Sequence, residues 1–233
     1  MNAAWSKLFG SPASARAKLA AKAPDGALRR YLETPVQPDD TPLREARLLA
    51  VDVETTGLDP KIDHLLSIGF VPVDGYQIQL AGAGQVLVRQ SAAVGESARF
   101  HGLTDDALAG GSTVAEAVDA LFTALCGRVL LAHHAAIETG FLNRACEQVY
   151  GMGAPFAVVD TMSIQFGLLS QGFDDEPPQG SLRLWNARGQ FGLPRYAAHE
   201  ALTDALACAE LYLAQVAELE SVRPRTLKSV LKR

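Results

Sequence analysis

The sequence predicts an α/β fold in which a mixed sheet carries helices on both of its faces. Three short apolar runs come first and are joined by short connections, which is typical of an antiparallel meander. Helix-like and strand-like segments then alternate through the rest of the chain, which fits a mixed sheet flanked by helices. The 233 residues are 48% apolar and 20% charged, which suits a soluble globular protein with one sizeable domain and an extension.

The expected domain spans residues 46–220, between an N-terminal arm, residues 1–45, and a C-terminal tail, residues 221–233. The arm begins with a basic stretch that has no acid before Asp25. This composition fits an amphipathic helix that docks on its own domain or on a partner, a targeting peptide, or a disordered segment. Three prolines then indicate a linker. The tail is basic and lacks acids, so it is either a phosphate-attracting arm or a solvated terminus.

Five short apolar runs predict the strands of the sheet. Asp74 and Gly75 form a turn signal directly after the second run, which supports a hairpin at this point. The runs are residues 47–51, 64–73, 85–88, 128–132 and 156–160.

Helices are predicted between and after these strands. Thr104 is a plausible cap for a helix after the third strand. Thr113 and Glu116 have the spacing of a capping box and open the next helix. Further helices are expected after residue 134 and over residues 162–169, 181–191 and 199–219.

The first strand leads into two acids, Asp52 and Glu54, which are two residues apart and therefore share one face of a strand. Thr55, Thr56 and Gly57 then end the strand in a turn. Two like charges at a buried strand end repel each other unless a cation neutralises them. The alternative is a solvated loop with two ordinary surface acids, so partners from elsewhere in the chain are needed to decide.

Three more candidates lie at helix starts. Glu138 lies near the start of the helix that follows His133 and His134, and His199 enters the last helix with Asp204 just over one turn later. Each has an ordinary structural alternative. A histidine can cap a helix, an acid can favour the first turn of a helix, and the histidine pair can end a strand without binding anything.

Taken in order, these residues resemble the DnaQ-like 3′-5′ exonucleases, a family that includes the proofreading epsilon subunit of bacterial DNA polymerase III. The resemblance covers residues 47–219. Its most specific parts are D-V-E-T-T-G at residues 52–57 and H-E-A-L-T-D-A at residues 199–205. Residues 100–104 resemble the substrate-side loop of the family, and residues 158–161 resemble the strand before its third helix. The resemblance implies a ribonuclease H-like fold with a mixed five-stranded sheet.

The resemblance also implies a metal-dependent phosphodiester hydrolase. Two divalent ions, Mg²⁺ or Mn²⁺, would be held by four carboxylates, which is the ligand set that such a pair of ions requires. Asp52, Glu54 and Asp204 would be the inner ligands, and Glu138 would complete the second metal site directly or through water. His199 would accept the proton of the attacking water, a task that suits an imidazole at neutral pH.

Substrate contacts are implied in the same way. Thr55, Thr56, Leu58 and His101 would hold the terminal nucleotide, with the side chain of Leu58 wedged against the base. The product would be a nucleoside 5′-monophosphate.

One motif departs from the family. The family usually has H-N-A-x-F-D where this chain has H-H-A-A-I-E at residues 133–138. The glutamate keeps the charge and the oxygen ligand but moves the carboxylate by about 1.5 Å, one carbon–carbon bond. Ile137 replaces a phenylalanine that could lie against a base. We expect these changes to bear on substrate preference and rate more than on metal binding.

The expected partners are single-stranded 3′ ends, with DNA as the first choice. RNA is the alternative substrate, and a non-catalytic interaction module that kept the fold is the alternative from another class. A polymerase or another protein could bind through the N-terminal arm. The formal charge of −5 argues against tight binding of duplex nucleic acid through a broad basic face. No apolar run approaches the roughly 20 residues of a membrane helix, and three cysteines without metal spacing indicate reduced thiols in a cytoplasmic protein.

Overall fold

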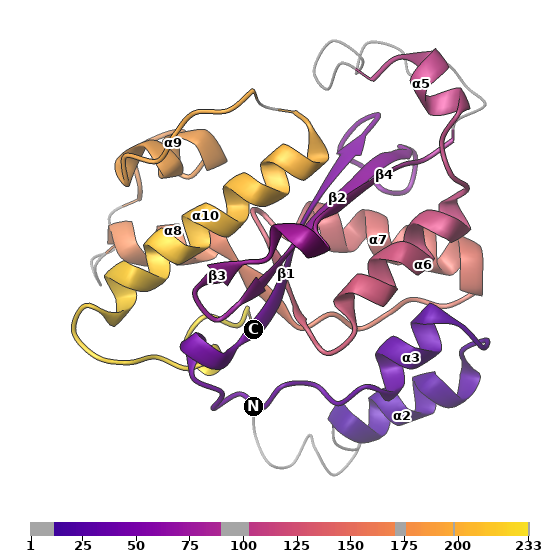
Figure 1. Ribbon diagram of the computed structural model, residues 1–233, viewed down its shortest axis with the longest axis horizontal. Helices are drawn as coiled ribbons and strands as arrows, with labels where there is room; N and C mark the ends of the chain where they lie inside the picture. Colours follow the sequence, from indigo (N-terminus) through magenta and orange to yellow (C-terminus); the bar gives the residue numbers. More distant parts are fainter. Residues whose placement is uncertain (1–11, 90–102, 171–175, 198, 233) are drawn as a thin grey trace.

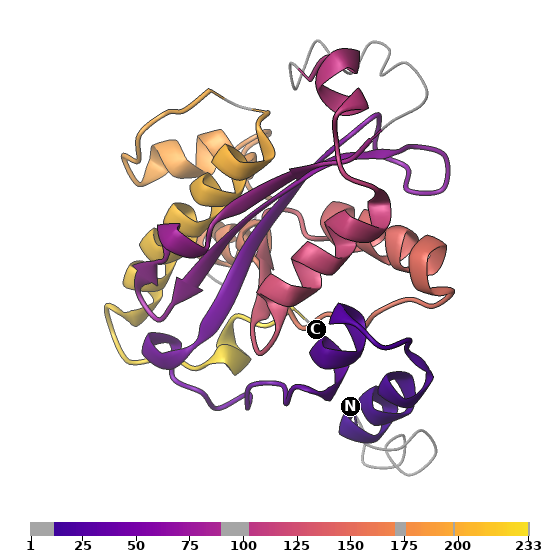
Figure 2. The ribbon, with the colours of Figure 1, turned by 45° about the vertical axis from the view of Figure 1, so that its right-hand side comes forward.

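The computed structural model describes residues 12–89, 103–170, 176–197 and 199–232. A mixed sheet lies between two layers of helices, with α8, α9 and α10 on one face and α6 and α7 on the other (Figures 1 and 2). The strands are β1 (Arg47–Thr55), β2 (Leu65–Asp74), β3 (Gln77–Ile78), β4 (Gly84–Leu87), β5 (Val129–Ala132) and β6 (Val158–Asp160). The helices are α2 (Pro12–Lys22), α3 (Ala27–Glu33), α5 (Asp105–Ala109), α6 (Val114–Leu125), α7 (Ala136–Tyr150), α8 (Thr161–Ser170), α9 (Leu184–Gln190) and α10 (Ala201–Glu220). The predicted fold class is confirmed.

The sheet has the order β3-β2-β1-β5-β6, and β4 also pairs with β2. β2 is antiparallel to β1, whereas β5 and β6 are added in parallel. This makes six strands among the described residues rather than the five that were predicted, because two short strands share one edge of β2. Pro72 explains the break between them. Its carbonyl accepts the N–H of Gln79 on this edge, but proline has no N–H to continue the ladder there.

Side chains of β1 alternate between the two faces, as a strand requires. Leu49, Val51 and Val53 join the core with α3, α6 and α7, while Leu48 and Ala50 join the core with α10. Asp52 and Glu54 continue the second row. Both acids are therefore directed to the face that α10 covers, and the core on either side fixes them there.

Capping residues set the helix starts much as expected. Thr104 caps α5 through a bond from the N–H of Ala107, and Thr113 forms a complete capping box with Glu116 at the start of α6. The predicted start of α10 at residue 199 is wrong by two residues. His199 has a φ of 69°, which no helix accepts, and Glu200 is the residue that precedes the first turn.

Helix α3 packs on α6, and α2 packs on α3. Tyr31 of α3 is buried, its ring centroid lies 5.0 Å from that of Phe122, and its hydroxyl donates to the carbonyl of Pro155 at 2.7 Å. Leu28 and Leu32 are buried in the same core cluster. This pair of helices therefore completes one face of the domain.

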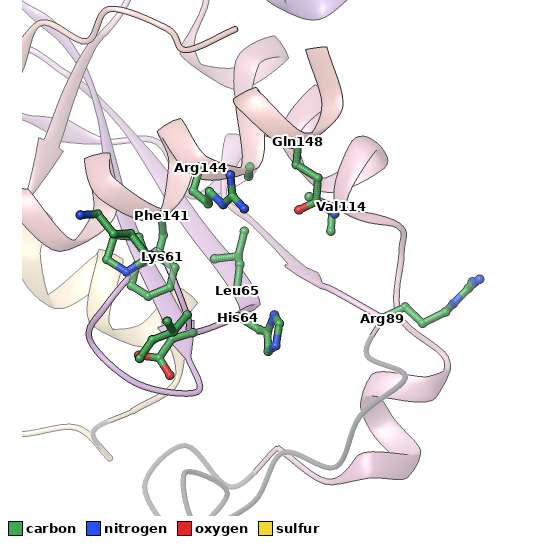
Figure 3. A pocket seen from close by; sticks show the side chains of 12 residues that line it. Lys61, His64, Leu65, Arg89, Val114, Phe141, Arg144 and Gln148 are labelled. Carbon is green, nitrogen blue, oxygen red and sulfur yellow. The ribbon is translucent and has the colours of Figure 1, made fainter. Parts of the chain in front are cut away.

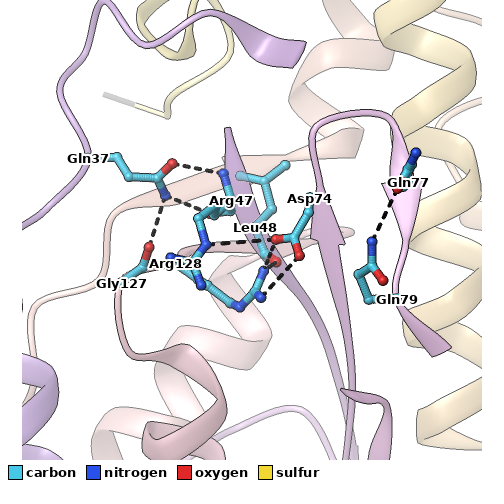
Figure 4. A network of polar contacts seen from close by, with 8 residues as sticks. All are labelled: Gln37, Arg47, Leu48, Asp74, Gln77, Gln79, Gly127 and Arg128. Atoms are coloured by element: carbon cyan, nitrogen blue, oxygen red, sulfur yellow. Dashed lines mark hydrogen bonds and ion pairs between the residues drawn. The ribbon is translucent and has the colours of Figure 1, made fainter. Parts of the chain in front are cut away.

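The segment between α3 and β1 is bound along the end of the sheet where β1 begins (Figure 4). The side chain of Gln37 bonds the N–H and the carbonyl of Arg47 and the carbonyl of Gly127. Arg128, just before β5, donates to the carbonyl of Leu48 and to the carboxylate of Asp74. These bonds hold β1, β2 and β5 in register at one end of the sheet.

The C-terminal tail also packs against the sheet. Leu227 is fully buried, the N–H of Lys232 donates to the carbonyl of Val158 at 2.8 Å, and Leu231 forms a bridge with Val159. The tail thus lies along the free edge of β6 and reaches the domain interior.

Within the described residues, no helix is both long and apolar enough to cross a membrane. The three cysteines are free thiols, and Cys146 and Cys208 are buried.

Candidate active site

A cavity of about 570 Å³ opens at the carboxyl ends of β1 and β5. Its walls come from the end of β1 with Leu58, the start of α7, the start of α10, and the segment at residues 180–184. The carboxyl end of a strand in an α/β sheet is where ligands commonly gather. Five of the residues that the sequence singled out for chemistry line this cavity: Asp52, Glu54, Glu138, His199 and Asp204.

Three of the acids form a tight cluster. Oxygen atoms of Asp52, Glu54 and Asp204 all lie within 4.8 Å of one another. A close approach of helix to sheet brings them together. A Cβ on Gly69 of β2, the partner of Asp52 in the ladder, would lie 2.1 Å from the backbone of Ala201. Only a glycine there lets the first turn of α10 reach the sheet and place Asp204 beside Asp52.

Glu138 borders this cluster without belonging to it. Its side chain is 4% exposed in the first turn of α7, and its Oε2 atom has no hydrogen-bond partner among the described residues. Burial, and then the charge of Glu138, are the main causes that raise the pKa of Asp52 well above its usual value. The charge of the fourth acid thus acts on Asp52.

All four carboxyls resist ionisation. Burial raises the pKa of Glu138 to about 8 and that of Glu54 to about 7, where the charge of Asp204 adds to the effect. Burial also raises the pKa of Asp204. Carboxylates held this close without a compensating cation repel each other, and divalent cations prefer such oxygen ligands. The unpartnered oxygens, Oε2 of Glu138 and Oδ1 of Asp204, fit the same conclusion, so these residues suit divalent metal ions.

His199 lies at the edge of the cavity and orients one of the acids. Its backbone N–H donates to Oδ2 of Asp204 at 2.9 Å, which leaves Oδ1 directed elsewhere. The positive φ of His199 makes this bond possible because the chain doubles back before α10 begins. A non-glycine residue in the left-handed region is uncommon and typical of functional sites.

The ring of His133, just after β5, forms hydrogen bonds to α8 and to the segment at residues 180–184. The carbonyl of Leu182 can only accept, so Nε2 of His133 donates to it at 2.8 Å and Nδ1 accepts from the hydroxyl of Thr161 at 2.8 Å. Burial lowers the pKa of His133 to about 4, although the bond to Leu182 raises it. The ring is neutral at physiological pH and both of its nitrogens are occupied by structural bonds.

An ion pair between a buried aspartate and the C-terminal tail was not foreseen from the sequence. Asp160 is fully buried and accepts the backbone N–H of His134 and of Met162, each at 3.0 Å, and Nζ of Lys232 at 2.7 Å. Burial raises the pKa of Asp160, but the bonds from Lys232 and His134 outweigh it and the pKa is lowered. The strand that ends in Asp160 was visible in the sequence, whereas nothing in the tail marked Lys232 as its partner.

Of the three predicted substrate contacts among the described residues, one lines the cavity. Leu58 is 76% exposed and lines the cavity, as a side chain available to a ligand should be. Thr55, the last residue of β1, and Thr56, which follows it, do not line the cavity. The hydroxyl of Thr55 donates to the carbonyl of Gly57, and that of Thr56 donates to Asp63. His101 lies outside the described residues.

Other lining residues escaped the sequence reasoning. They include Met162 and four residues of the segment at residues 180–184, namely Gly180, Leu182, Arg183 and Leu184. This segment had been assigned only to a loop and the start of a helix, and a loop carries no period that would reveal which side chains face a cavity.

Comparison with known proteins places the chain in a family. A family model described as exonuclease matches residues 49–212. The DNA polymerase III subunit epsilon of Treponema pallidum is 31% identical over 72% of this chain and 75% of its own length. The DNA polymerase III PolC-type of Thermotoga maritima is 27% identical over 88% of this chain. The chain spans only 15% of the length of that PolC-type relative.

Solved structures agree on the fold. The nuclease domain of 3′hExo, described as a DEDDh family member bound to rAMP, superposes with a TM-score of 0.65 at 15% identity, over 81% of this chain and 97% of that one. At this identity the likeness establishes the fold alone.

Proposed function

Because the chain belongs to the DnaQ-like exonuclease family, we propose that it is a 3′-5′ exonuclease that releases nucleoside 5′-monophosphates from single-stranded ends, with DNA as the preferred substrate. The observation that carries the proposal is the cluster of Asp52, Glu54 and Asp204, with oxygens within 4.8 Å of one another in an open cavity. Family membership alone would leave a non-catalytic module possible. A mutually repelling set of acids, with Asp204 buried and Asp52 and Glu54 half-buried, is costly to keep in a protein that binds no cation.

The acids are the proposed metal ligands. Asp52, Glu54 and Asp204, with Glu138 directly or through water, would hold two divalent ions, Mg²⁺ or Mn²⁺, which supply an activated water and neutralise charge on the phosphate. Glu138 is buried in the first turn of α7, so its carboxylate has few alternative positions. Its side chain is one methylene longer than the family's usual aspartate, and the charge of Asp160 also acts on it.

His199 is the proposed general base. It lines the cavity on the same side as Asp204 and is held by its own backbone bond to that acid. An imidazole so placed accepts the proton of a water that attacks the phosphorus atom. The backbone bond fixes the main chain of His199 beside Asp204.

Leu58 and Ile137 are the proposed contacts to the terminal nucleotide. Both line the cavity, and Leu58 is exposed enough to lie against a base. An aliphatic contact discriminates poorly between bases, so we propose hydrolysis with little sequence preference. Thr55 and Thr56 would act by shaping the turn that carries Leu58, and His101 remains a proposed contact of the sugar or base.

Association with a DNA polymerase in replication or repair is also part of the proposal. It rests on the relatives, which are named as DNA polymerase III subunits or PolC-type polymerases. The N-terminal arm remains a proposed place for a partner. Free thiols suit the reducing cytoplasm, which is the proposed location.

The test is hydrolysis of end-labelled single strands of DNA and RNA of the same sequence. The protein is assayed with Mg²⁺, with Mn²⁺ and with excess chelator. We expect mononucleotides from the 3′ end, a requirement for divalent ions, and faster hydrolysis of DNA. Hydrolysis that persists in chelator would contradict the metal mechanism. Faster hydrolysis of RNA would contradict the proposed preference for DNA. No hydrolysis of either strand would favour the non-catalytic interaction module.

A further inference from the structure

A second hollow, which we call the basic groove, lies beside the candidate active site and has a volume of about 440 Å³. Its polar lining includes Lys61, His64, Arg89, Arg144 and Gln148. In Figure 3, the side chains of Arg144 and Gln148 point from α7 toward His64, with Leu65 between them. We propose that the basic groove binds the phosphate backbone of the substrate strand a few nucleotides upstream of the cleaved end. This inference rests on the proposed exonuclease function.

The groove and the active-site cavity share two structural elements. On α7, Ile137 and Glu138 line the cavity, and Phe141 and Arg144 line the groove. The helix rises 1.5 Å per residue, so Arg144 lies about 9 Å farther along α7 than Glu138. Successive phosphates of one strand are about 3.4 Å apart along B-form DNA and farther apart when the strand is stretched. A strand leaving the cavity along α7 would therefore reach the groove within about three nucleotides.

The loop between β1 and β2 is the second shared element. Leu58, at its start, lines the cavity, whereas Pro60, Lys61 and His64 line the groove. The loop rests directly on α7, because a Cβ on Gly140 would lie 3.2 Å from the ring of Pro60. The two hollows are thus on either side of one loop-to-helix contact.

The charge of the groove is opposite to that of the whole chain. Its lining has three permanent cations, Lys61, Arg89 and Arg144, against one acid, whereas the formal charge of the chain is −5. The acid, Asp63, is occupied by the N–H of Asp59 at 2.9 Å and the hydroxyl of Thr56 at 3.3 Å. Positive charge therefore exceeds negative charge among the residues that line the groove.

The cations are also free to act on a ligand. Lys61 is exposed and has no ion pair with any residue in the described parts of the chain. Arg144 makes only a loose exposed contact, 3.7 Å, with Glu147 on the same helix. Such surface pairs are weak and exchange readily for a phosphate. Arg89 uses its Nε atom to bond the carbonyl of Gly111, which leaves the end of its guanidinium for a ligand.

The lining favours phosphates over bases. Two apolar side chains in the lining, Leu65 and Phe141, are only 7% and 2% exposed, so the ring of Phe141 offers little surface on which a base could stack. Binding through Lys and Arg alone is independent of sequence and sensitive to salt. The groove therefore suits an enzyme that must advance along any sequence.

The test measures how activity depends on substrate length. Domains that bind single strands cover about 4–16 nucleotides, so we compare strands from a dinucleotide to about ten nucleotides with a chromogenic diester of one nucleotide. The measured quantity is kcat/KM for each strand divided by kcat/KM for the diester, within the same protein. We expect this ratio to rise over the first few nucleotides in the parent protein. Lys61→Gln and Arg144→Gln should each lower the ratio for long strands about two- to fivefold, and the double variant should lower it about tenfold.

Arg30→Gln is the matched control, because Arg30 is an exposed arginine on α3, outside the groove lining. It should leave the ratio as in the parent. The double variant should also flatten the plot of log kcat/KM against log salt for long strands by about 0.7 for each charge removed. A ratio unchanged in the double variant would overturn the inference, and would leave an acidic segment of a protein partner as the occupant. No hydrolysis of the diester or of any strand by the parent would instead refute the proposed function.

Discussion

At the scale of single residues, the main feature of the molecule is that acids are placed where their charges are costly. Asp52 has its pKa raised by burial and by Glu138, Asp204 and Glu54. We predict that Asp52→Asn and Asp204→Asn each lower kcat by at least about 10³-fold, equivalent to about 4 kcal/mol of lost transition-state stabilisation. Steady-state hydrolysis of a labelled single strand measures this. The amide keeps the shape of the side chain and loses the charge that a metal ion requires.

The same substitutions should raise the melting temperature of the metal-free protein, because each removes a charge from a mutually repelling set. Divalent ions, in turn, should stabilise the parent protein more than either variant. A variant that is less stable than the parent in chelator would show that these acids serve the fold and not a metal site.

The backbone conformation of His199, with a φ of 69°, allows a substitution that separates the role of its imidazole from that of its backbone. Asparagine tolerates the left-handed region better than most residues, so His199→Asn removes the imidazole and keeps the backbone bond to Asp204. We predict a fall in turnover of about 10²- to 10⁴-fold, the usual contribution of a general base, with little change in melting temperature. His199→Ala should add backbone strain and lose some stability as well. If His199→Asn kept the parental turnover, His199 would have only a structural role before α10.

Glu138 makes the stability of the metal-free protein depend on pH. Its pKa is raised to about 8 in the folded state, against about 4.3 for an unperturbed glutamate. Between these two pKa values the folded state holds a proton that the unfolded state releases. The contribution of Glu138 to stability is therefore fully present below about pH 4 and is lost as the pH rises through about 8. Glu54, with a pKa of about 7, acts in the same direction.

We therefore predict that the melting temperature in chelator falls by several degrees between about pH 5 and pH 8.5, and that Mg²⁺ or Mn²⁺ reverses the fall at the higher pH. Glu138→Gln should make the dependence on pH shallower, because Glu54 then acts without its neighbour. Thermal unfolding of both proteins across this range is the measurement. The same pH dependence in the two proteins would exclude Glu138 as the source.

Sequence reasoning reached part of this site and not the rest, for physical reasons. The two-residue period of a strand places Asp52 and Glu54 on one face, and the order of acids along the chain identifies Asp204. The distance of Glu138 from the other three depends on how α7 packs, which no local pattern encodes. The pair of Lys232 with Asp160 joins residues that lie far apart in the chain, and it depends on the path of the tail.

At the scale of elements, α9 and α10 are joined by one buried arginine. Arg188 is 1% exposed and donates to the carbonyls of Ala207 and Pro194, at 2.6 and 2.8 Å, and to the carboxylate of Glu210 at 2.8 Å. It thereby holds the backbone at Pro194 against α10. Removing this arginine would be costly, because its three acceptors would lose their hydrogen-bond donor.

We predict that Arg188→Met costs about 3 kcal/mol of stability, which lowers the melting temperature by about 6–12 °C in a domain of this size. Turnover should fall as well, because the approach to His199 loosens. Arg188→Lys keeps the charge but cannot reach three acceptors at once, so its loss should be intermediate. Arg195→Met removes an exposed charge nearby and should change neither quantity. Thermal unfolding and steady-state turnover report both effects, and parental stability in Arg188→Met would refute this role.

Elements with strong local signals were predicted well, and those shaped by distant contacts were not. The capping box of Thr113 and Glu116 and the cap at Thr104 are visible in four consecutive residues. The edge of β2 is divided between β3 and β4 at Pro72, which has no N–H. The sequence shows this proline, but it does not show which neighbouring strand its nitrogen faces. Arg188 had no signal at all, because its acceptors are backbone carbonyls and one distant acid.

At the scale of the whole molecule, the C-terminal tail is bound to the segment between α3 and β1. The N–H groups of Leu227 and Lys228 donate to the carbonyls of Thr41 and Asp39, at 2.9 and 2.7 Å, so the tail is bound by the segment that follows α3. That tail in turn delivers Lys232 to Asp160. The N-terminal segment therefore supports the wall of the active-site cavity at a distance, although it contributes no proposed ligand.

A protein that begins at Pro42 tests this arrangement. Removing the preceding residues exposes the surface of α6 that Leu28, Tyr31 and Leu32 cover, and burial of each such side chain stabilises by about 1.5–3 kcal/mol. We predict a loss of about 5 kcal/mol, a large part of the stability of a typical domain. Chemistry should survive at low temperature, since all proposed ligands lie between Asp52 and Asp204. A protein that begins at Pro12 should match the full chain in both respects. Thermal unfolding and hydrolysis of the single-nucleotide diester separate the outcomes: unchanged stability would contradict the packing role, and a folded but inactive protein would place the N-terminal helices in the reaction itself.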